Sequence, residues 1–202
     1  MTFKVKIRNL GLRDINVVSN YMRNFTITRN KFSTDEVWLV QHYPIFTFGV
    51  SEHKYNWIVP QNISIIFSDR GGKTTYHGPG QLIAYFLIDL VRRKLTVKNF
   101  ILLLQNIILS TLRHFSIYAY ILNEFPGIYI NNKKICSFGL RIKKGCSLYG
   151  IALNIDMDLS PFNYIYPCGN NFKMTQVIDI KPHLNFKIVQ LVLIKNIKKY
   201  FI

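Results

Sequence analysis

The sequence predicts a single α+β domain over residues 1–202, with a mixed, largely antiparallel sheet flanked by helices. Its length and composition support one folded unit, because 202 residues with 49% hydrophobic and 18% charged side chains can bury a sizeable core. Strand-like runs outnumber helical ones, and turn residues between them favour hairpins. The sequence contains no internal repeat, linker or low-complexity tract, so nothing in it divides the chain.

The first part of the chain is expected to form strands around one surface helix. Residues 3–9 alternate in polarity as an opening strand does, and residues 14–25 form the helix because apolar side chains recur there at helical spacing. These apolar side chains are Ile15, Val18, Tyr21, Met22 and Phe25. Further strands are expected at residues 36–41, 45–48, 63–67 and 82–90.

The second part is expected to place four strands between two helices. Thr96 is the N-cap of a helix that runs to about residue 115 and should be largely buried, since apolar positions cover most of its surface. The four strands cover residues 117–121, 127–130, 134–142 and 148–155, with turns at Asn131-Asn132 and Gly145. An amphipathic helix with a basic face is expected at residues 186–200.

The net charge is strongly positive, with 26 Lys and Arg against 10 Asp and Glu and a formal charge of +16. Attraction to a polyanion or to an acidic protein explains it, and so does composition bias, because the lysines are scattered and accompany many Ile, Asn, Tyr and Phe residues. The N-terminus lacks a signal-peptide pattern, and apolar runs fall far short of the roughly 20 residues of a membrane span. Three cysteines without CxxC spacing favour free thiols, so we expect a cytoplasmic protein.

The segment at residues 70–85 carries the strongest functional signal and reads RGGKTTYHGPGQLIAY. Its four glycines and one proline are more than a plain connecting loop requires. They indicate a backbone that passes very close to a bound group, to which Arg70, Lys73, Thr75 and His77 offer polar atoms. The sequence therefore predicts that this segment forms one wall of a binding site.

A candidate nucleophile is Cys168, which lies between Pro167 and Gly169. This pair indicates a tight turn, between one strand and the next, that presents the thiol, although a small buried cysteine in an ordinary turn fits the same pattern. A reactive thiolate requires a base or a cation beside it. His77 in the glycine-rich segment and Lys134 at the start of a strand are both candidates.

The remaining chemical groups are expected to be structural. Cys136 lies in an alternating strand and is expected to pack, and Cys146 follows a turn glycine. Four further histidines show no ligand spacing, so no metal site is indicated: His42, His53, His114 and His183. Asp69 is expected to be a turn or cap residue.

Several motifs together resemble those of the bacterial octanoyltransferases, the lipoyl(octanoyl) transferases of lipoate biosynthesis. They occur in the family's order and cover roughly residues 40–180: the segment 43–49, the glycine-rich string 70–81, Lys134-Ile135 followed by Ser137-Phe138-Gly139, the strand 150–154, and Pro167-Cys168-Gly169. Tyr149 departs from the pattern, because many members have histidine there, and so do Val50, Asn170 and Gln176-Val177.

The resemblance implies a catalytic domain like that of lipoate- and biotin-protein ligases, working as a monomer without metal or cofactor. It implies transfer of octanoyl from octanoyl-acyl carrier protein to a lysine of lipoyl domains, those of 2-oxo acid dehydrogenase E2 subunits and of glycine cleavage H protein. Cys168 would carry the acyl group as a thioester, and Lys134 would lower the thiol pKa and transfer the proton. The implied substrate-binding residues are Arg70, Gly71, Gly72, Lys73, Thr74, Thr75, Tyr76, His77, Ser137, Phe138, Gly139, Gly150, Ile151 and Ala152.

Three other functions fit parts of the sequence. An ATP-dependent lipoate-protein ligase of the same fold has a related glycine-rich segment but does not need Cys168. A nucleic-acid-binding protein would use the positive charge, although the sequence carries no RNA- or DNA-binding motif. A thiol hydrolase would use the same cysteine with water as the acceptor.

Overall fold

The computed structural model describes residues 4–52, 60–165 and 172–201, which form an α+β fold with two sheets. The larger sheet has the strand order β1 (Val5–Arg13), β2 (Asp35–His42), β6 (Gln81–Leu87), β10 (Cys146–Asn154), β9 (Lys133–Lys143), β8 (Ile128–Ile130), β7 (Tyr120–Ile121). Its neighbouring strands are antiparallel except β1 and β2, which are parallel. The predicted α+β fold with a mixed, largely antiparallel sheet is therefore confirmed.

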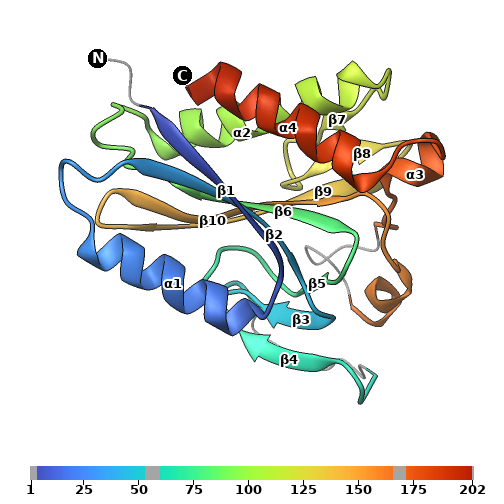
Figure 1. Ribbon diagram of the computed structural model, residues 1–202. Helices are drawn as coiled ribbons and strands as arrows, with labels where there is room; N and C mark the ends of the chain where they lie inside the picture. The colour runs from blue at the N-terminus through green and yellow to red at the C-terminus, as the bar shows by residue number, and fades with distance from the viewer. Residues whose placement is uncertain (1–3, 53–59, 166–171, 202) are drawn as a thin grey trace.

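The helices cover both faces of the larger sheet (Figure 1). They are α1 (Ile15–Thr28), α2 (Val97–His114), the short α3 (Val177–Ile180) and α4 (Phe186–Phe201), with a 3₁₀ turn η1 at Ser160–Tyr164. Helices α2 and α4 pack together on one face, and α1 lies on the opposite face. Alternation along β6 divides the core, because Ala84 and Phe86 face α2 and α4 whereas Ile83 and Tyr85 face α1.

Side chains cap the starts of α1 and α2, and the cap at Thr96 is the predicted one. Asp14 accepts hydrogen bonds from the backbone nitrogens of Asn16 and Val17, and Thr96 accepts one from Asn99. The prediction that helix α2 is largely buried is wrong. Its buried side chains form one stripe, and Val97 and Leu102 are exposed. The prediction assumed that the core surrounds most of this helix. Instead, α4 and the larger sheet cover only part of its circumference, and the rest faces the solvent.

A smaller sheet of three strands lies beside α1, on the same face of the larger sheet (Figure 1). Its order is β4 (Ser64–Phe67), β3 (Ile45–Phe48), β5 (Thr75–His77). Strand β5 was not predicted, because it is three residues long and lies inside the glycine-rich segment. It pairs antiparallel with β3 and so turns this segment into a wall opposite the larger sheet.

The two predicted hairpin turns are present around β9. Asn131 and Asn132 have φ values of +47° and +60°, and they form the two-residue connection between Ile130 and Lys133. Gly145 has a φ of +72° and follows Lys144 at +49° in the turn between β9 and β10. These turns set the register of β9, which carries Lys134 at its start.

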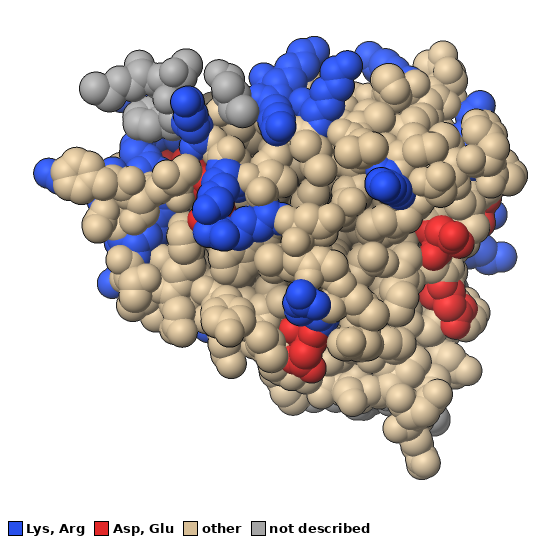
Figure 2. All heavy atoms as spheres, in the orientation of Figure 1, with Lys and Arg blue, Asp and Glu red and all other residues tan. Residues whose placement is uncertain are grey.

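Within the described ranges, no helix is long and apolar enough to cross a membrane. In the same ranges, no three His, Cys, Asp or Glu side chains are grouped so that they could hold a metal ion. Basic side chains on the face shown in Figure 2 lie in separate groups on a largely uncharged surface, with few acidic side chains. The scattered lysines of the sequence thus remain scattered on this face of the folded chain.

Candidate active site

A cavity lies between the α1 face of the larger sheet and the smaller sheet. Twelve of the predicted substrate-binding residues line it: Arg70, Gly72, Lys73, Thr74, Thr75, His77, Ser137, Phe138, Gly139, Gly150, Ile151 and Ala152. Six further lining residues were not predicted: Ile15, Thr47, Ser68, Ile83, Tyr85 and Tyr149. Segments far apart in the sequence therefore meet around one hollow, with strands β6, β9 and β10 on one side and the glycine-rich segment on the other.

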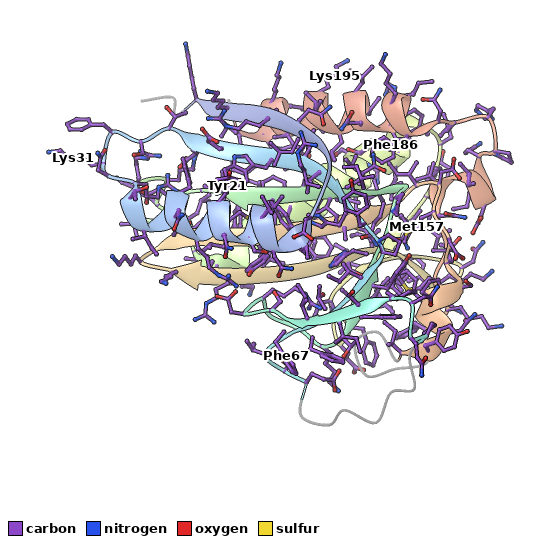
Figure 3. All side chains as sticks on the ribbon, turned by 60° about the horizontal axis from the view of Figure 1, so that its bottom comes forward. Tyr21, Lys31, Phe67, Met157, Phe186 and Lys195 are labelled. Atoms are coloured by element: carbon purple, nitrogen blue, oxygen red, sulfur yellow. The ribbon has the colours of Figure 1, made fainter. Side chains whose placement is uncertain are left out.

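Gly71 and Tyr76 lie outside the lining of this cavity. The Gly71 nitrogen donates a hydrogen bond to the Leu140 carbonyl at 2.9 Å, so the segment pairs with the edge of β9. The Tyr76 ring is buried against Phe46 and Phe162, at 5.4 and 5.6 Å between ring centroids. This apolar group also includes Met157, labelled in Figure 3. Gly71 and Tyr76 therefore hold the glycine-rich segment in place without lining the cavity.

The glycines of the segment allow close contact with the protein's own backbone. A Cβ on Gly71 would lie 2.9 Å from the Leu140 oxygen, and one on Gly80, whose φ is +85°, would lie 1.7 Å from the Asp156 oxygen. The sequence interpretation assigned this close approach to a bound group, and the contacts with residues 140 and 156 explain these two glycines without one. Glycine is needed at these two positions because the segment packs tightly against β9 and against the chain that follows β10.

A hydrogen-bond network holds in place several polar residues that line the cavity or lie next to it. The buried Arg70 donates from Nη2 to the Thr47 carbonyl at 2.7 Å and from Nε to Thr47 Oγ1 at 3.1 Å. Gln81 Oε1 lies 2.7 Å from His77 Nδ1, and Gln81 Nε2 donates to Asn154 Oδ1 at 2.9 Å. Asn154 Nδ2 donates to the Thr175 carbonyl at 3.0 Å, so the network reaches the segment beside Lys134. Thr47, Gln81 and Asn154 lie in segments that the resemblance marked, but the sequence assigned them no role in the site, because only folding brings them together.

His77 is held as a neutral imidazole. Burial, with His42 and Arg70 nearby, lowers its pKa to about 3. Since the Gln81 amide oxygen is a hydrogen-bond acceptor, Nδ1 carries the proton, and Nε2 lies 3.5 Å from Thr47 Oγ1. A neutral ring cannot hold a thiolate by charge, and an imidazole with so low a pKa is too weak a base to take the proton of a thiol. His77 and Lys134 were the two candidates for the group that holds the thiolate. His77 is therefore a part of the cavity wall and does not have this role.

Lys134 is fully buried at the start of β9. Its Nζ donates a hydrogen bond to the Pro126 carbonyl at 3.0 Å and lies 5.3 Å from the centre of the Tyr129 ring. A Cβ on Gly127 would lie 2.6 Å from Lys134 Cε, so glycine at this position makes room for the lysine stem. A carbonyl and an aromatic face hold an ammonium group in place inside the protein. The side chain of Lys134 is thus removed from water inside the protein.

The predicted nucleophile Cys168 lies outside the described residues, but both flanks are described. Before it the chain forms the 3₁₀ turn Ser160–Tyr164, with Pro161 in the first turn, and after it Met174 forms a single bridge with Lys134. The prediction that two strands flank this cysteine is therefore wrong. Proline suits the start of a helical turn, since it has no N–H to donate there. Phe172 lies with its ring centre 5.2 Å from that of Tyr129, which also contacts Lys134.

The other two cysteines are buried and free, as expected for packing residues. Burial strongly raises the pKa of the Cys136 thiol. Burial likewise raises the pKa of Cys146. Neither thiol has the exposure or the lowered pKa of a reactive nucleophile.

Comparison with known proteins assigns the family. The sequence matches the family described as the lipoyl protein ligase A/B catalytic domain over residues 19–201. A relative from Buchnera aphidicola subsp. Baizongia pistaciae, named octanoyltransferase, is 66% identical over 98% of this chain and 97% of its own. The chain belongs to the bacterial octanoyltransferases of this family. The predicted family and the predicted enzyme class are confirmed. An octanoyltransferase of Vibrio cholerae is also similar, with 46% identity over 98% of this chain and 91% of the relative.

Solved structures share the fold at much lower identity. A crystal structure of lipoate-protein ligase A bound with ATP superposes with a TM-score of 0.81 at 16% identity, covering 98% of this chain and 85% of that one. A biotin protein ligase from Aquifex aeolicus, in complex with biotin and ATP, gives a TM-score of 0.56 at 12% identity, covering 98% and 70%. The predicted likeness to the lipoate- and biotin-ligase catalytic domains is therefore confirmed as a likeness of fold.

Proposed function

We propose that this chain transfers octanoyl from octanoyl-acyl carrier protein to a lysine of lipoyl domains, as the first step of lipoate synthesis. The acceptors would be the lipoyl domains of 2-oxo acid dehydrogenase E2 subunits and glycine cleavage H protein. One observation carries the proposal beyond family membership: the backbone of Lys134, whose ammonium is buried, pairs with residues 173–175, shortly after the segment that holds Cys168. The reaction belongs to the cytoplasm, where thiols remain reduced, and one copy of the chain suffices for it.

In the first half-reaction the Cys168 thiolate attacks the carbonyl carbon of the thioester. A bond forms between that carbon and the Cys168 sulfur, and the bond to the phosphopantetheine sulfur breaks. Lys134 stabilises the attacking thiolate by its charge and gives a proton to the departing phosphopantetheine thiolate, which leaves as the thiol. One thioester replaces another, so the step is nearly balanced in free energy and needs no ATP.

In the second half-reaction the acceptor lysine amine attacks the acyl carbon. A carbon–nitrogen bond forms, the bond to the Cys168 sulfur breaks, and Lys134 takes the proton that the amine loses. The product is an amide, which is more stable than a thioester, so this step runs downhill. Neither half-reaction calls for a metal ion or a cofactor.

The cavity beside β9 and β10 is where the proposal places the octanoyl chain. Its lining is largely apolar on the side of the larger sheet, with Ile83, Phe138 and Ala152 among the lining residues. Neutral His77 and the paired Arg70 guanidinium place no unpartnered charge against an acyl chain. An apolar wall with fixed polar groups at one side suits a hydrocarbon chain that ends in a thioester.

The experiment mixes the purified chain with octanoyl-acyl carrier protein in the absence of ATP. Intact mass and peptide mapping are expected to show one octanoyl group on Cys168, and Cys168→Ala should show none. Cys146→Ala is the matched control and should be acylated like the unaltered chain, because its thiol is buried elsewhere. An unaltered chain that stays free of octanoyl would contradict the proposal.

Added lipoyl domain then separates the transferase from its alternatives. The transferase yields octanoyl-lysine on that domain, whereas a thiol hydrolase releases free octanoate as its main product. Octanoic acid with ATP and the lipoyl domain tests the ligase, and we expect no modification of the domain. A nucleic-acid-binding protein would instead bind DNA or RNA with an affinity that falls steeply with salt.

A further inference from the structure

Tyr149 interrupts the regular alternation of β10 at the cavity. Its φ is +62°, a left-handed value that is uncommon for a bulky residue inside a strand. Leu148 and Tyr149 consequently pack in the same apolar cluster on the α1 face, where alternation would place one of them on each side of the sheet. The backbone of β10 thus turns the Tyr149 ring toward the cavity, which this residue lines.

Ser147 compensates for the interrupted pairing between β10 and β6. Its hydroxyl donates to the Phe86 carbonyl at 2.6 Å and accepts from the Ile88 nitrogen at 3.1 Å. Phe86 is in β6 and Ile88 follows directly after it, so both groups lie opposite the irregular part of β10. The unusual conformation of Tyr149 is therefore built into the sheet.

Polar and aromatic contacts hold the Tyr149 side chain in one position. Its hydroxyl donates a short hydrogen bond to Asp69 Oδ1, which also receives Arg23 Nη2 at 3.2 Å. Arg141 Nε lies 3.3 Å from the other oxygen of Asp69. The ring meets Tyr85 edge to face, with ring centres 5.9 Å apart. Helix α1, the segment after β4, and strands β6, β9 and β10 therefore all meet at this ring.

The strand register places Tyr149 at the far end of the cavity from Lys134. Ser137, three residues after Lys134 on β9, pairs with Ala152, and Leu140 pairs with Tyr149. These two pairs are three residue steps apart, which is about 10 Å along the strands. An extended octanoyl chain, with seven carbon–carbon bonds of about 1.5 Å each in a zigzag, reaches about 9 Å. The distance from Ser137 to Tyr149 therefore matches the length of this acyl chain.

We propose that Tyr149, held by Asp69 and Arg23, closes the end of the acyl cavity and limits the acyl chain to octanoyl length. This inference rests on the proposed function, because it takes the cavity as the acyl site. A longer chain would have to displace a ring that is fixed on two sides by Tyr85 and Asp69. Tyr149 would thus be a specificity-determining residue, and Asp69 would act through it as a positioning residue.

The decisive variant is Tyr149→Gly, because glycine accepts a φ of +62° without strain while the ring is removed. Acylation of the full chain is followed by intact mass with equimolar octanoyl-, decanoyl- and dodecanoyl-carrier proteins competing. We expect the ratio of dodecanoyl to octanoyl product to rise at least tenfold in this variant. Asp69→Asn should raise the same ratio by a smaller factor, and Tyr149→Phe, which keeps the ring, should change it least.

The matched control is Tyr21→Ala, which removes an exposed tyrosine of α1, labelled in Figure 3. Its product ratio should equal that of the unaltered chain. Octanoate and dodecanoate are tested in parallel for the rise in melting temperature that each produces in every variant. Dodecanoate should stabilise Tyr149→Gly more than it stabilises the unaltered chain.

Acylation products and melting temperatures test the proposed function and the role of Tyr149 separately. An unaltered chain that is not acylated by octanoyl-carrier protein contradicts the proposed function, while the melting temperatures still test the closed end of the cavity. A Tyr149→Gly variant that reacts with octanoyl-carrier protein and keeps the original product ratio overturns the role of Tyr149. If this variant does not fold, Tyr149→Leu replaces it with the same expected direction and the same overturning result.

Discussion

Lys134 and Met174 lie opposite each other in a parallel β-bridge. The Lys134 nitrogen donates to the Lys173 carbonyl, and the Thr175 nitrogen donates to the Lys134 carbonyl, both at 2.9 Å. The bridge joins the start of β9 to the chain that follows residues 166–171. Cys168, the proposed nucleophile, is six residues before Met174 in the sequence.

Replacing Lys134 is expected to slow formation of the acyl-enzyme. Without the ammonium charge the Cys168 thiol should have a higher pKa, so in Lys134→Met less thiolate is present at neutral pH. The rate of acylation should fall by about a hundredfold or more, and the pH profile should move to higher pH. Lys133→Met, at the exposed neighbouring position, is the control and should react normally. An unchanged pH profile in Lys134→Met would refute the role of this residue.

Stability should fall as the pH drops below neutral, because two histidines are buried in their neutral form. Burial lowers the pKa of His42 to about 4 and, with His42 and Arg70 nearby, that of His77 to about 3. The unfolded chain takes up these protons below about pH 6.5 and the native state does not, so unfolding is favoured as pH decreases. Each histidine should cost about 1 to 2 kcal/mol between pH 7 and pH 5.

Urea unfolding at pH 7, 6 and 5 measures this loss. His77→Gln should show a shallower dependence on pH than the unaltered chain. His114→Gln, at an exposed histidine, should retain the full dependence. Equal dependence on pH in His77→Gln and the unaltered chain would show that His77 is protonated in the native state.

The buried carboxylate of Asp35 is expected to be important for stability. Its oxygens lie 2.6 Å from guanidinium nitrogens of Arg29, Arg92 and Arg93, and the Asp89 nitrogen donates to it at 2.9 Å. Asp35→Asn removes the buried carboxylate that the three guanidinium groups share, so the free energy of unfolding should fall by about 3 kcal/mol.

Equilibrium unfolding in urea measures the effect of Asp35→Asn. Asp156→Asn serves as the control, because residue 156 is exposed, and it should change the free energy of unfolding by less than about 0.5 kcal/mol. A loss in Asp35→Asn as small as that of the control would mean that these ion pairs do not contribute to stability.

Alanine substitutions at two glycines distinguish the stability cost of an unfavourable backbone conformation from that of crowding by neighbouring atoms. Gly80 and Gly11 have φ values of +85° and +67°, but a Cβ would lie 1.7 Å from the Asp156 oxygen at Gly80 and would contact nothing within 4 Å at Gly11. Gly11→Ala should cost about 1 to 2 kcal/mol from conformation alone. Gly80→Ala should cost clearly more, since the backbone of residue 156 must also move.

Unfolding free energies of the two alanine variants give the comparison directly. The difference between them reports the contact of residue 80 with residue 156. Equal losses would show that this contact relaxes at no cost.

Local patterns in the sequence determined most of the elements. The helix cap at Thr96 is a local signal, because its side chain bonds to a backbone group three residues away. The turn at Asn131-Asn132 is equally local, since both residues must adopt positive φ. Such features are present in a short stretch of chain, and they appear in the structure where the sequence predicts them.

The site was predicted in part, and the missing part depends on long-range contacts. Arg70, Lys134 and the motif residues of β9 and β10 were identified because the resemblance marks them. Thr47, Gln81 and Tyr149 were missed as site residues, since their roles arise from partners tens of residues away. The short strand Thr75–His77 was missed for the same reason, because its pairing with β3 decides it.

The sequence by itself determined the family, the order of most elements and the residue types available for chemistry. These follow from side-chain spacing and motif strings, which do not change on folding. The tertiary structure alone decided that the ammonium of Lys134 is buried, that His77 is a neutral part of the wall, and that Tyr149 faces the cavity. Burial, pKa and direction depend on what surrounds a side chain, and those neighbours come from distant parts of the chain.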